Sequence, residues 1–338
     1  MIRQPFCLFG GGILVKKFML LTLMGMLLIP FSGCTAKVQE PESKYKEEEV
    51  FLAYKEGKLF GSLMEPQEEG DGTLVIIIPG SGPTDRNGNN PQAGTSNNLK
   101  MIAEALSDHG IYSLRYDKRG IGESKSILKK ESEMDFYMSI HDVISWIEKF
   151  KDDARFKKIL LLGHSEGALI AAAAEVASVD VDGLISVSGT ALPADELLLK
   201  QLKFQSESLY EKGLPIVEEL KKGNLVTELP VELFTLFRPT VQPYLISWFS
   251  YAPQKVISKV NVPVLILHGR NDLQVSFEDA KLLHQACEGS ELSIIKGMNH
   301  ILKDAPIDME GNLATYNQPE LPLSEGFMEK IIEFIDNL

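Results

Sequence analysis

The chain has 338 residues, of which 44% are hydrophobic, so it is long and apolar enough to bury a substantial core. This composition excludes a disordered chain, which would be poor in hydrophobic residues. The formal net charge is −13 at pH 7, whereas nucleic-acid-binding surfaces normally carry clustered Lys and Arg. We therefore expect no nucleic-acid partner and favour a small-molecule ligand.

Residues 1–33 differ from the rest of the chain. Basic residues come first, at Arg3, Lys16 and Lys17. An uncharged apolar run follows over 18–29, and small residues then precede Cys34. This order is that of a secretory signal peptide, and the run is shorter than the ~20 residues that a membrane-spanning helix needs. An uncleaved N-terminal anchor is the alternative.

The sequence Pro-Phe-Ser-Gly-Cys over 30–34 resembles the lipobox of bacterial lipoproteins, in which the cysteine is lipidated and becomes the mature N-terminus. Phe31 stands where that pattern usually has Leu. The resemblance implies an exported protein of the bacterial cell envelope that is lipid-anchored to a membrane through Cys34. Residues 34–49 are rich in Glu and Lys, and we interpret them as a solvated tether to a domain over 50–338.

The domain begins with a predicted β-hairpin, followed by a buried strand. Strands over 50–54 and 58–63 are separated by a Glu-Gly turn, which is typical of an antiparallel pair. Residues 73–78 form a continuous, mostly β-branched run without polar alternation. Such a run indicates a strand that helices cover on both faces.

The loop over 79–89 is rich in glycine. Gly80 and Gly82 let backbone N–H groups face a cavity. A serine acyl-transfer enzyme needs one such donor here and one just after its nucleophile, because both hold the developing oxyanion. We predict an oxyanion hole made by the N–H groups of Ser81 and Glu166, with Gly82 as the substitute for Ser81. The alternative is a phosphate-binding loop, but no Gly-Lys-Ser/Thr follows.

Helices and strands alternate through the next part of the chain. Helical spacing of apolar residues covers 98–109 and 136–150, and a strand is expected over 111–116. A turn dense in Gly and charged residues follows this strand over 117–124. The alternation implies a parallel sheet.

Residues 159–170 contain the motif Gly-x-Ser-x-Gly centred on Ser165. Four apolar residues lead into the motif and an Ala-rich segment follows, which predicts a buried strand, a sharp turn and a helix. Gly163 and Gly167 remove side chains that would collide in so tight a turn. The pattern is that of a nucleophile elbow, with the Ser165 hydroxyl raised at a helix N-terminus.

After a further strand over 181–188 the alternation stops. The segment from 190 to about 257 is expected to form several short helices, because prolines and a glycine punctuate it at Pro193, Pro215, Gly223, Pro230, Pro239 and Pro243. Six aromatic residues crowd its second half, as they would in a lid over an apolar cavity. A self-contained packing cluster is the alternative.

Strands resume over 262–268 and 290–295, with helices expected over 277–286 and 327–335. Asp272 follows the first of these strands and His300 follows the second. Catalytic groups gather at the carboxyl ends of parallel strands. A serine nucleophile needs a base to take its proton and a carboxylate to orient that base. We predict His300 as the base and Asp272 as the acid.

Other candidates for the two roles fit less well. His109, His141 and His284 fall inside predicted helices, while His164 belongs to the turn and His268 ends a strand. His300 could instead be an ordinary surface histidine. For the acid, Glu278 and Asp279 lie on the next helix. Asp272 could instead cap that helix, although Ser276 is nearer its start.

The chain order Ser165, Asp272, His300 is that of the α/β-hydrolase triad, and the chain resembles an α/β-hydrolase from about residue 50 to its end. The motifs over 79–86 and 297–300 resemble a bacterial carboxylesterase subfamily related to the serine aminopeptidase S33 hydrolases. The turn over 116–124 is also similar to one widespread in the superfamily. The resemblance implies an α/β fold with a mostly parallel eight-stranded sheet, helices on both faces and a helical lid.

The expected function is that of a serine carboxylesterase acting on short acyl esters through an acyl-enzyme. The expected partner is a small-molecule ester, with no cofactor or metal, since the chain has neither His-Glu-x-x-His nor a Cys pair. An S33-type aminopeptidase or an acyltransferase would use the same triad, and a ligand-binding lipoprotein without catalysis is a further alternative. A peptidase would need acidic groups near its pocket; the candidates are Glu207, Glu211, Glu218, Glu219 and Glu232.

Overall fold

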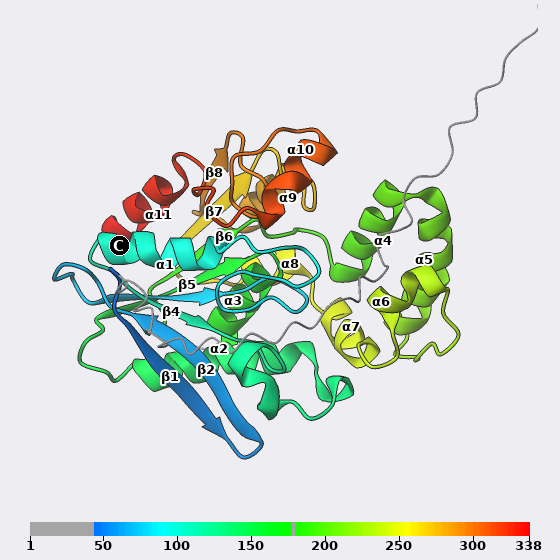
Figure 1. Ribbon diagram of the computed structural model, residues 1–338, viewed down its shortest axis with the longest axis horizontal. Coiled ribbons are helices and arrows are strands. Elements are labelled where there is room, and N and C mark those ends of the chain that lie inside the picture. The colour runs from blue at the N-terminus through cyan, green and yellow to red at the C-terminus, as the bar shows by residue number, and fades with distance from the viewer. Residues whose placement is uncertain (1–43, 178–179) are drawn as a thin grey trace, which may run out of the picture. The chain divides into compact units, whose positions relative to one another are not determined.

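The computed structural model describes residues 44–177 and 180–338. The predicted signal peptide over 1–33, Cys34 and most of the predicted tether lie outside the described residues. Within them, eight strands form one sheet in the order β1-β2-β4-β3-β5-β6-β7-β8 (Figure 1). The strands are β1 (Glu47–Tyr54), β2 (Gly57–Met64), β3 (Thr73–Ile78), β4 (Tyr112–Tyr116), β5 (Lys158–His164), β6 (Gly183–Val187), β7 (Val264–Gly269) and β8 (Glu291–Ile295).

The sheet is mostly parallel, as the sequence predicted. β1 pairs with β2 and β2 with β4 in antiparallel fashion, and the pairs from β4 through to β8 are parallel. The opening hairpin begins at Glu47 rather than at Val50, because Glu47 to Glu49 continue the pairing with the end of β2. Residues 47–49, which we interpreted as the end of the tether, therefore belong to β1.

Helices cover both faces of this sheet. The helices outside the predicted lid are α1 (Asn98–Asp108), α2 (Phe136–Phe150), α3 (Glu166–Ala177), α9 (Phe277–Ala286), α10 (Met309–Ala314) and α11 (Phe327–Asp336). Short 3₁₀ turns cover Gly122–Ile127, Glu131–Glu133, Val231–Leu233 and Thr315–Asn317. α1 and α11 pack on one face, while α2, α3 and α9 pack on the other. The 3₁₀ turns and α10 were not predicted, because segments this short carry little periodic signal.

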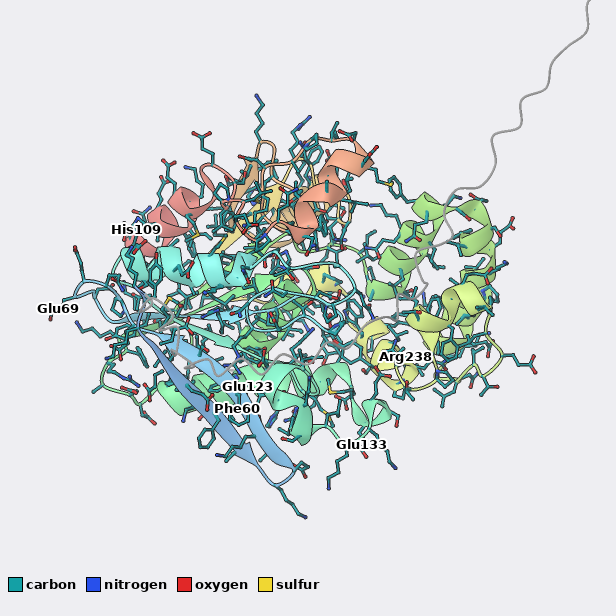
Figure 2. The ribbon with its side chains drawn as sticks, in the orientation of Figure 1. Phe60, Glu69, His109, Glu123, Glu133 and Arg238 are labelled. Carbon is teal, nitrogen blue, oxygen red and sulfur yellow. The ribbon has the colours of Figure 1, made fainter. Side chains whose placement is uncertain are left out.

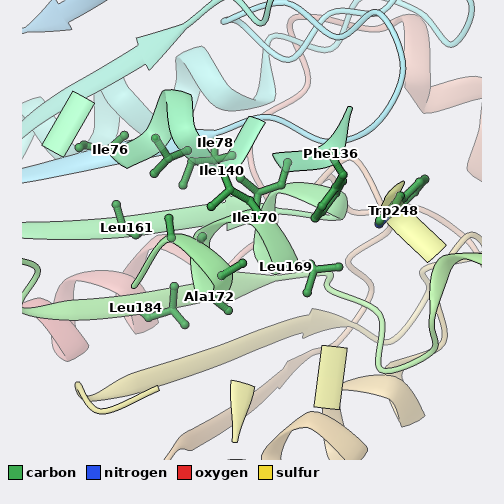
Figure 3. Packing of buried hydrophobic residues seen from close by; sticks show 14 of the residues in the cluster. Ile76, Ile78, Phe136, Ile140, Leu161, Leu169, Ile170, Ala172, Leu184 and Trp248 are labelled. Atoms are coloured by element: carbon green, nitrogen blue, oxygen red, sulfur yellow. The ribbon is translucent and has the colours of Figure 1, made fainter. Parts of the chain in front are cut away.

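The core consists of two apolar layers, one on each side of the sheet. Successive residues of a strand point to opposite faces, so Ile76 and Ile78 of β3 join the layer under α2 and α3. Val75 and Ile77 join the layer under α1 and α11. Figure 3 shows the first layer, where Ile140 of α2 and Ile170 of α3 lie against the sheet. All of β3 is buried, which explains its unbroken apolar sequence.

Between β6 and β7 the described chain is helical and contains no strand. The helices are α4 (Ala194–Gln205), α5 (Glu207–Lys221), α6 (Phe234–Phe237), α7 (Gln242–Phe249) and α8 (Pro253–Ile257), and α4 to α7 lie together beside the sheet (Figure 1). We call residues 190–257 the lid. The predicted break at Pro215 is wrong, because α5 runs through it. Burial of Ile216, Val217 and Leu220 stabilises the helix by about 1.5–3 kcal/mol each, enough to offset the missing hydrogen bond.

None of the helices in residues 44–177 and 180–338 combines the length and the apolar character needed to span a bilayer.

Candidate active site

Ser165 occupies a strained turn between the end of β5 and the start of α3. Its φ angle is 57°, in the left-handed region that residues other than glycine rarely adopt. The backbone N–H of Ser165 donates to the carbonyl oxygen of Val187 at 2.8 Å, which ties the turn to the end of β6. This conformation is the one expected of a nucleophile elbow.

The two glycines of the motif are required by close backbone approach. A Cβ atom on Gly163 would lie 2.1 Å from the carbonyl oxygen of Gly167. A Cβ atom on Gly167 would lie 2.4 Å from the carbonyl oxygen of Ile78, where β3 ends. Both distances are far inside van der Waals contact, so a side chain at Gly163 would force the turn itself open and one at Gly167 would force the turn and β3 apart.

The structure brings Ser165, His300 and Asp272 together. The Nε2 atom of His300 lies 3.1 Å from the Ser165 hydroxyl oxygen, and its Nδ1 atom lies 2.7 Å from Oδ2 of Asp272. These contacts join the loops after β5, β7 and β8, all at the carboxyl end of the sheet. When Nδ1–H donates to Asp272, the free lone pair of Nε2 is left to accept the serine proton.

Asp272 is held as a carboxylate by its surroundings. Its Oδ1 atom accepts the backbone N–H groups of Gln274 at 2.8 Å and Val275 at 2.9 Å. Burial by itself would raise the pKa of Asp272, but the charge of His300 and hydrogen bonds from His268 and His300 outweigh it and hold that pKa well below its usual range. The cap of α9 is Ser276, so Asp272 is not used as that cap.

His164, next to the nucleophile, supports the loop that carries His300. Its Nε2–H donates to the backbone carbonyl oxygen of His300 at 2.8 Å. Burial, with the nearby charge of His300, lowers the pKa of His164 to about 3, so the ring is neutral near pH 7. His164 therefore donates to the backbone of the base and takes no proton from the nucleophile.

The residues of the predicted oxyanion hole lie beside Ser165. Glu166 is the first residue of α3, where backbone N–H groups have no partner within the helix. A Cβ atom on Gly80 would lie 3.2 Å from the Cβ of Ser165, so the loop after β3 runs along the nucleophile. Ser81, which follows Gly80, lines the same two cavities as Ser165.

The side chain of Lys118 binds two backbone carbonyl groups of this loop. Its Nζ atom donates to the carbonyl oxygens of Gly80 at 2.5 Å and Gly82 at 2.8 Å. In a trans peptide the C=O and the following N–H point in opposite directions. Fixing the Gly80 carbonyl on Lys118 therefore fixes the direction of the Ser81 N–H. Burial lowers the pKa of Lys118, and the nearby Glu166 carboxyl opposes that shift.

Asp117 and Arg119, on either side of Lys118 in the same turn, bind other segments around the active site. Asp117 accepts the backbone N–H of Arg86 at 2.9 Å and pairs with its guanidinium at 2.7 Å. Arg119 pairs with the buried Asp142 of α2 at 2.7 Å. The charged turn noted in the sequence thus anchors the glycine-rich loop near its start, at Gly80, and further along, at Arg86.

Ser165 lies between two cavities. The larger, which we call the lid cavity, has a volume of about 360 Å³ and is lined by Ser165, Glu166 and side chains of the lid. The smaller, which we call the loop cavity, has a volume of about 110 Å³ and is lined by Ser165, His300 and residues of the loops after β3 and β8. Tyr244 and Trp248 are the lid aromatics, within the described chain, that line the lid cavity, while Phe237 is buried in the core.

Several polar contacts join the lid to the core, and two of them lie near the nucleophile or at the edge of the lid. Tyr244 of α7 donates to Oε1 of Glu166, and burial raises the pKa of Glu166 to about 7, with Lys118 acting in the opposite direction. Arg238 pairs with Glu131 in the 3₁₀ turn Glu131–Glu133, and Figure 2 shows Arg238 near this turn. These contacts hold the lid over the nucleophile.

Two of the histidines that the sequence analysis set aside lie away from Ser165. His109 is at the C-terminal end of α1 (Figure 2), and His284 contacts Ser290 at the far end of α9. Cys34 lies outside the described residues. The roles of Lys118 and Tyr244 were not predicted, because each depends on contacts between residues far apart in the sequence. In the described part of the chain, no group of three or more His, Cys, Asp or Glu side chains is placed to hold a metal ion.

Comparison with known proteins identifies several relatives. Residues 92–227 match the family model described as serine aminopeptidase, S33. The esterase EstD of Thermotoga maritima is 28% identical over 284 residues, covering 80% of this chain, which spans 64% of the length of EstD. The human serine hydrolase BPHL is 24% identical over 310 residues, covering 87% of this chain and 92% of BPHL.

The solved structure of Est1E from Butyrivibrio proteoclasticus superposes with a TM-score of 0.56 at 18% sequence identity. The superposition covers 85% of this chain and 99% of Est1E. The sheet order, the strained serine turn after β5 and the lid between β6 and β7 agree with this likeness. The chain has the α/β-hydrolase fold.

Proposed function

We propose that this protein is a serine hydrolase that cleaves carboxylic esters, with short acyl groups as the expected substrates. The observation that carries the proposal is the hydrogen-bonded series from the Ser165 hydroxyl through His300 to Asp272, at 3.1 and 2.7 Å. The similarity to EstD, whose name describes an esterase, supports the same reaction.

In the proposed reaction His300 takes the proton of Ser165 as its oxygen attacks the ester carbonyl carbon. The N–H groups of Ser81 and Glu166 stabilise the negative oxygen of the tetrahedral intermediate. His300 then protonates the departing alcohol, and water, activated by the same histidine, releases the carboxylic acid from Ser165. Asp272 keeps Nδ1 protonated and stabilises the imidazolium that forms.

The lid favours esters over peptides with a free N-terminus. A peptidase of that kind needs acidic side chains close to the nucleophile to bind the amine. None of the five lid glutamates named above, all within the described residues, lines the lid cavity. Three of them pair with lysines instead, namely Glu207, Glu219 and Glu232. The acidic residue that lines the cavity is Glu166, whose carboxyl already accepts from Tyr244.

The test is hydrolysis of p-nitrophenyl acetate and butyrate by the purified domain, compared with Ser165→Ala. We expect the substitution to lower turnover by about 10⁴-fold or more while thermal unfolding changes little. Aminoacyl anilides assayed in parallel measure peptidase activity and are expected to react far more slowly than the esters. Ester hydrolysis that survives Ser165→Ala would refute the proposal.

For localisation we propose that the mature protein is lipidated at Cys34 and held on a membrane of the bacterial cell envelope. The support is the sequence of residues 1–34 alone. The test is expression of the full chain in bacteria fed an alkyne-bearing fatty acid. The wild-type chain is expected to carry the label and to sediment with membranes, whereas Cys34→Ala is expected to do neither. An unlabelled wild-type chain would overturn the proposal.

A further inference from the structure

The two cavities beside Ser165 differ in size and in lining. The lid cavity, at about 360 Å³, has apolar walls from three lid helices, including Leu197, Leu236 and Trp248. The loop cavity, at about 110 Å³, has mixed walls that include Thr84, Ile301 and Tyr316. A substrate whose carbonyl carbon is attacked by Ser165 must extend in more than one direction, so each cavity is available to a different part of it.

His300 lines the loop cavity and does not line the lid cavity. This asymmetry matters because the departing oxygen must take its proton from Nε2 of His300, which requires hydrogen-bond reach. The alcohol therefore has to leave on the side of His300. The acyl substituent, which stays bonded to the same carbon after the alcohol has gone, must point away from that side.

On the basis of the proposed ester hydrolysis, we infer that the lid cavity binds the acyl group and the loop cavity binds the alcohol. The substrate class is an ester of a small alcohol with a larger, mainly apolar acyl group. The loop cavity has room for about four water-sized groups, at about 30 Å³ each. The lid cavity lies within the range of about 300–1,000 Å³ that small-molecule sites occupy.

The same arrangement accounts for the second half of the reaction. The first half forms the bond from Ser165 oxygen to the acyl carbon, breaks the bond to the alcohol oxygen and moves the serine proton through His300 to the alcohol. When the alcohol leaves, water occupies the loop cavity. It gives a proton to His300, bonds to the acyl carbon and displaces Ser165, which recovers that proton as the carboxylic acid leaves.

The test uses two series of esters and one variant in each cavity. One series holds methanol constant and lengthens a linear acyl group, and the other holds butyrate constant and lengthens a linear alcohol. Leu236→Trp fills part of the lid cavity, and since Leu236 is only half-buried the change should be tolerated. Tyr316→Ala enlarges the loop cavity. Val231→Ala, at an 89% exposed position of the lid, is the matched control.

We expect Leu236→Trp to lower kcat/KM for the longer acyl groups by about tenfold or more, with the relative rates across the alcohol series unchanged. We expect Tyr316→Ala to raise the relative rates of the longer alcohols and to leave the acyl preference unchanged. The control should match the wild type in both series. If circular dichroism shows that Leu236→Trp is misfolded, Leu197→Trp takes its place in the lid cavity. If Tyr316→Ala is misfolded, Tyr316→Leu takes its place in the loop cavity.

The opposite pattern would overturn the inference: an altered alcohol preference in Leu236→Trp, or an altered acyl preference in Tyr316→Ala. Failure of the proposed function looks different, because then the wild-type protein would hydrolyse neither series. The two failures are thus told apart by the wild-type rates alone.

Discussion

The side-chain nitrogen of Lys118 lies 2.5 Å from the carbonyl oxygen of Gly80, the residue that precedes one predicted oxyanion donor. The contact crosses from the turn after β4 to the loop after β3. It sets the direction of the Ser81 N–H without any contact between Lys118 and the reacting atoms. Lys118 is therefore a positioning residue.

We predict that Lys118→Met lowers kcat for ester hydrolysis by about 10- to 100-fold, because a displaced oxyanion donor costs this much when it moves by about 1 Å. KM should change little, since the cavity walls are untouched. Lys118→Arg, which keeps a donor, should recover part of the loss. Steady-state kinetics measure both constants.

Lys129→Met is the control for the lysine series, because Lys129 is exposed in the loop before α2. It should behave as the wild type. Equal losses in Lys118→Met and Lys118→Arg, or a change confined to KM, would contradict the positioning role.

The two glycines of the serine turn give a second prediction. Gly167→Ala places a Cβ atom 2.4 Å from the Ile78 carbonyl oxygen and Gly163→Ala places one 2.1 Å from the Gly167 carbonyl oxygen. Either variant should lose nearly all activity and unfold at a clearly lower temperature. Gly223→Ala is the comparison, because its Cβ would meet no atom within 4 Å and only its φ of 83° is unfavourable, at about 1–2 kcal/mol. Calorimetry that finds all three alike would contradict the account of the turn.

His164 provides a third prediction. His164→Ala removes the donor to the His300 carbonyl oxygen, so the loop that carries the base loses a restraint. We expect kcat to fall by about tenfold or more, with partial recovery in His164→Gln, whose amide can still donate. His109→Ala, on α1, should leave kcat unchanged. If His164→Ala also leaves kcat unchanged, the hydrogen bond does not position the base.

The pH dependence of stability tests the burial of Glu166. Burial raises its pKa from 4.5 to about 7, so between these values the folded chain binds a proton that the unfolded chain has lost. The stability contributed by this group is therefore complete below pH 4.5 and is lost as the pH rises to 7. Relative to Glu166→Gln, the wild-type free energy of unfolding should fall across this window, by at most about 1.4 kcal/mol per pH unit. Denaturant unfolding at a series of pH values measures the difference in free energy of unfolding between the wild type and Glu166→Gln. A difference that does not change with pH would contradict the raised pKa of Glu166.

The sequence predicted the parts of the fold that are coded locally. β3 and β5 each contain an unbroken apolar run, and the pattern around Ser165 is contiguous, so each could be recognised without knowledge of its neighbours. His300 and Asp272 could be named because each follows a strand and parallel strands share one carboxyl edge. What remained was whether these distant residues meet, and the distances from Ser165 to His300 and from His300 to Asp272 answer this.

Other features could not be predicted, because they arise from packing. The prolines of the lid suggested short helices, yet α5 continues through Pro215 once its apolar face is buried. The turn after β4 was noticed for its charges, but nothing local pairs Lys118 with a loop 38 residues earlier. The contact between Tyr244 and Glu166 likewise needs the lid to fold back over α3.

The atom that carries the acyl group during turnover distinguishes Ser165 from any other nucleophile. The protein is mixed with excess p-nitrophenyl butyrate, quenched in acid within milliseconds, digested and analysed by mass spectrometry. We expect a butyryl group on the Ser165 hydroxyl of the wild-type chain and none in Ser165→Ala. Rapid hydrolysis with a butyryl group on another residue, or equal labelling of that peptide in Ser165→Ala, would contradict it.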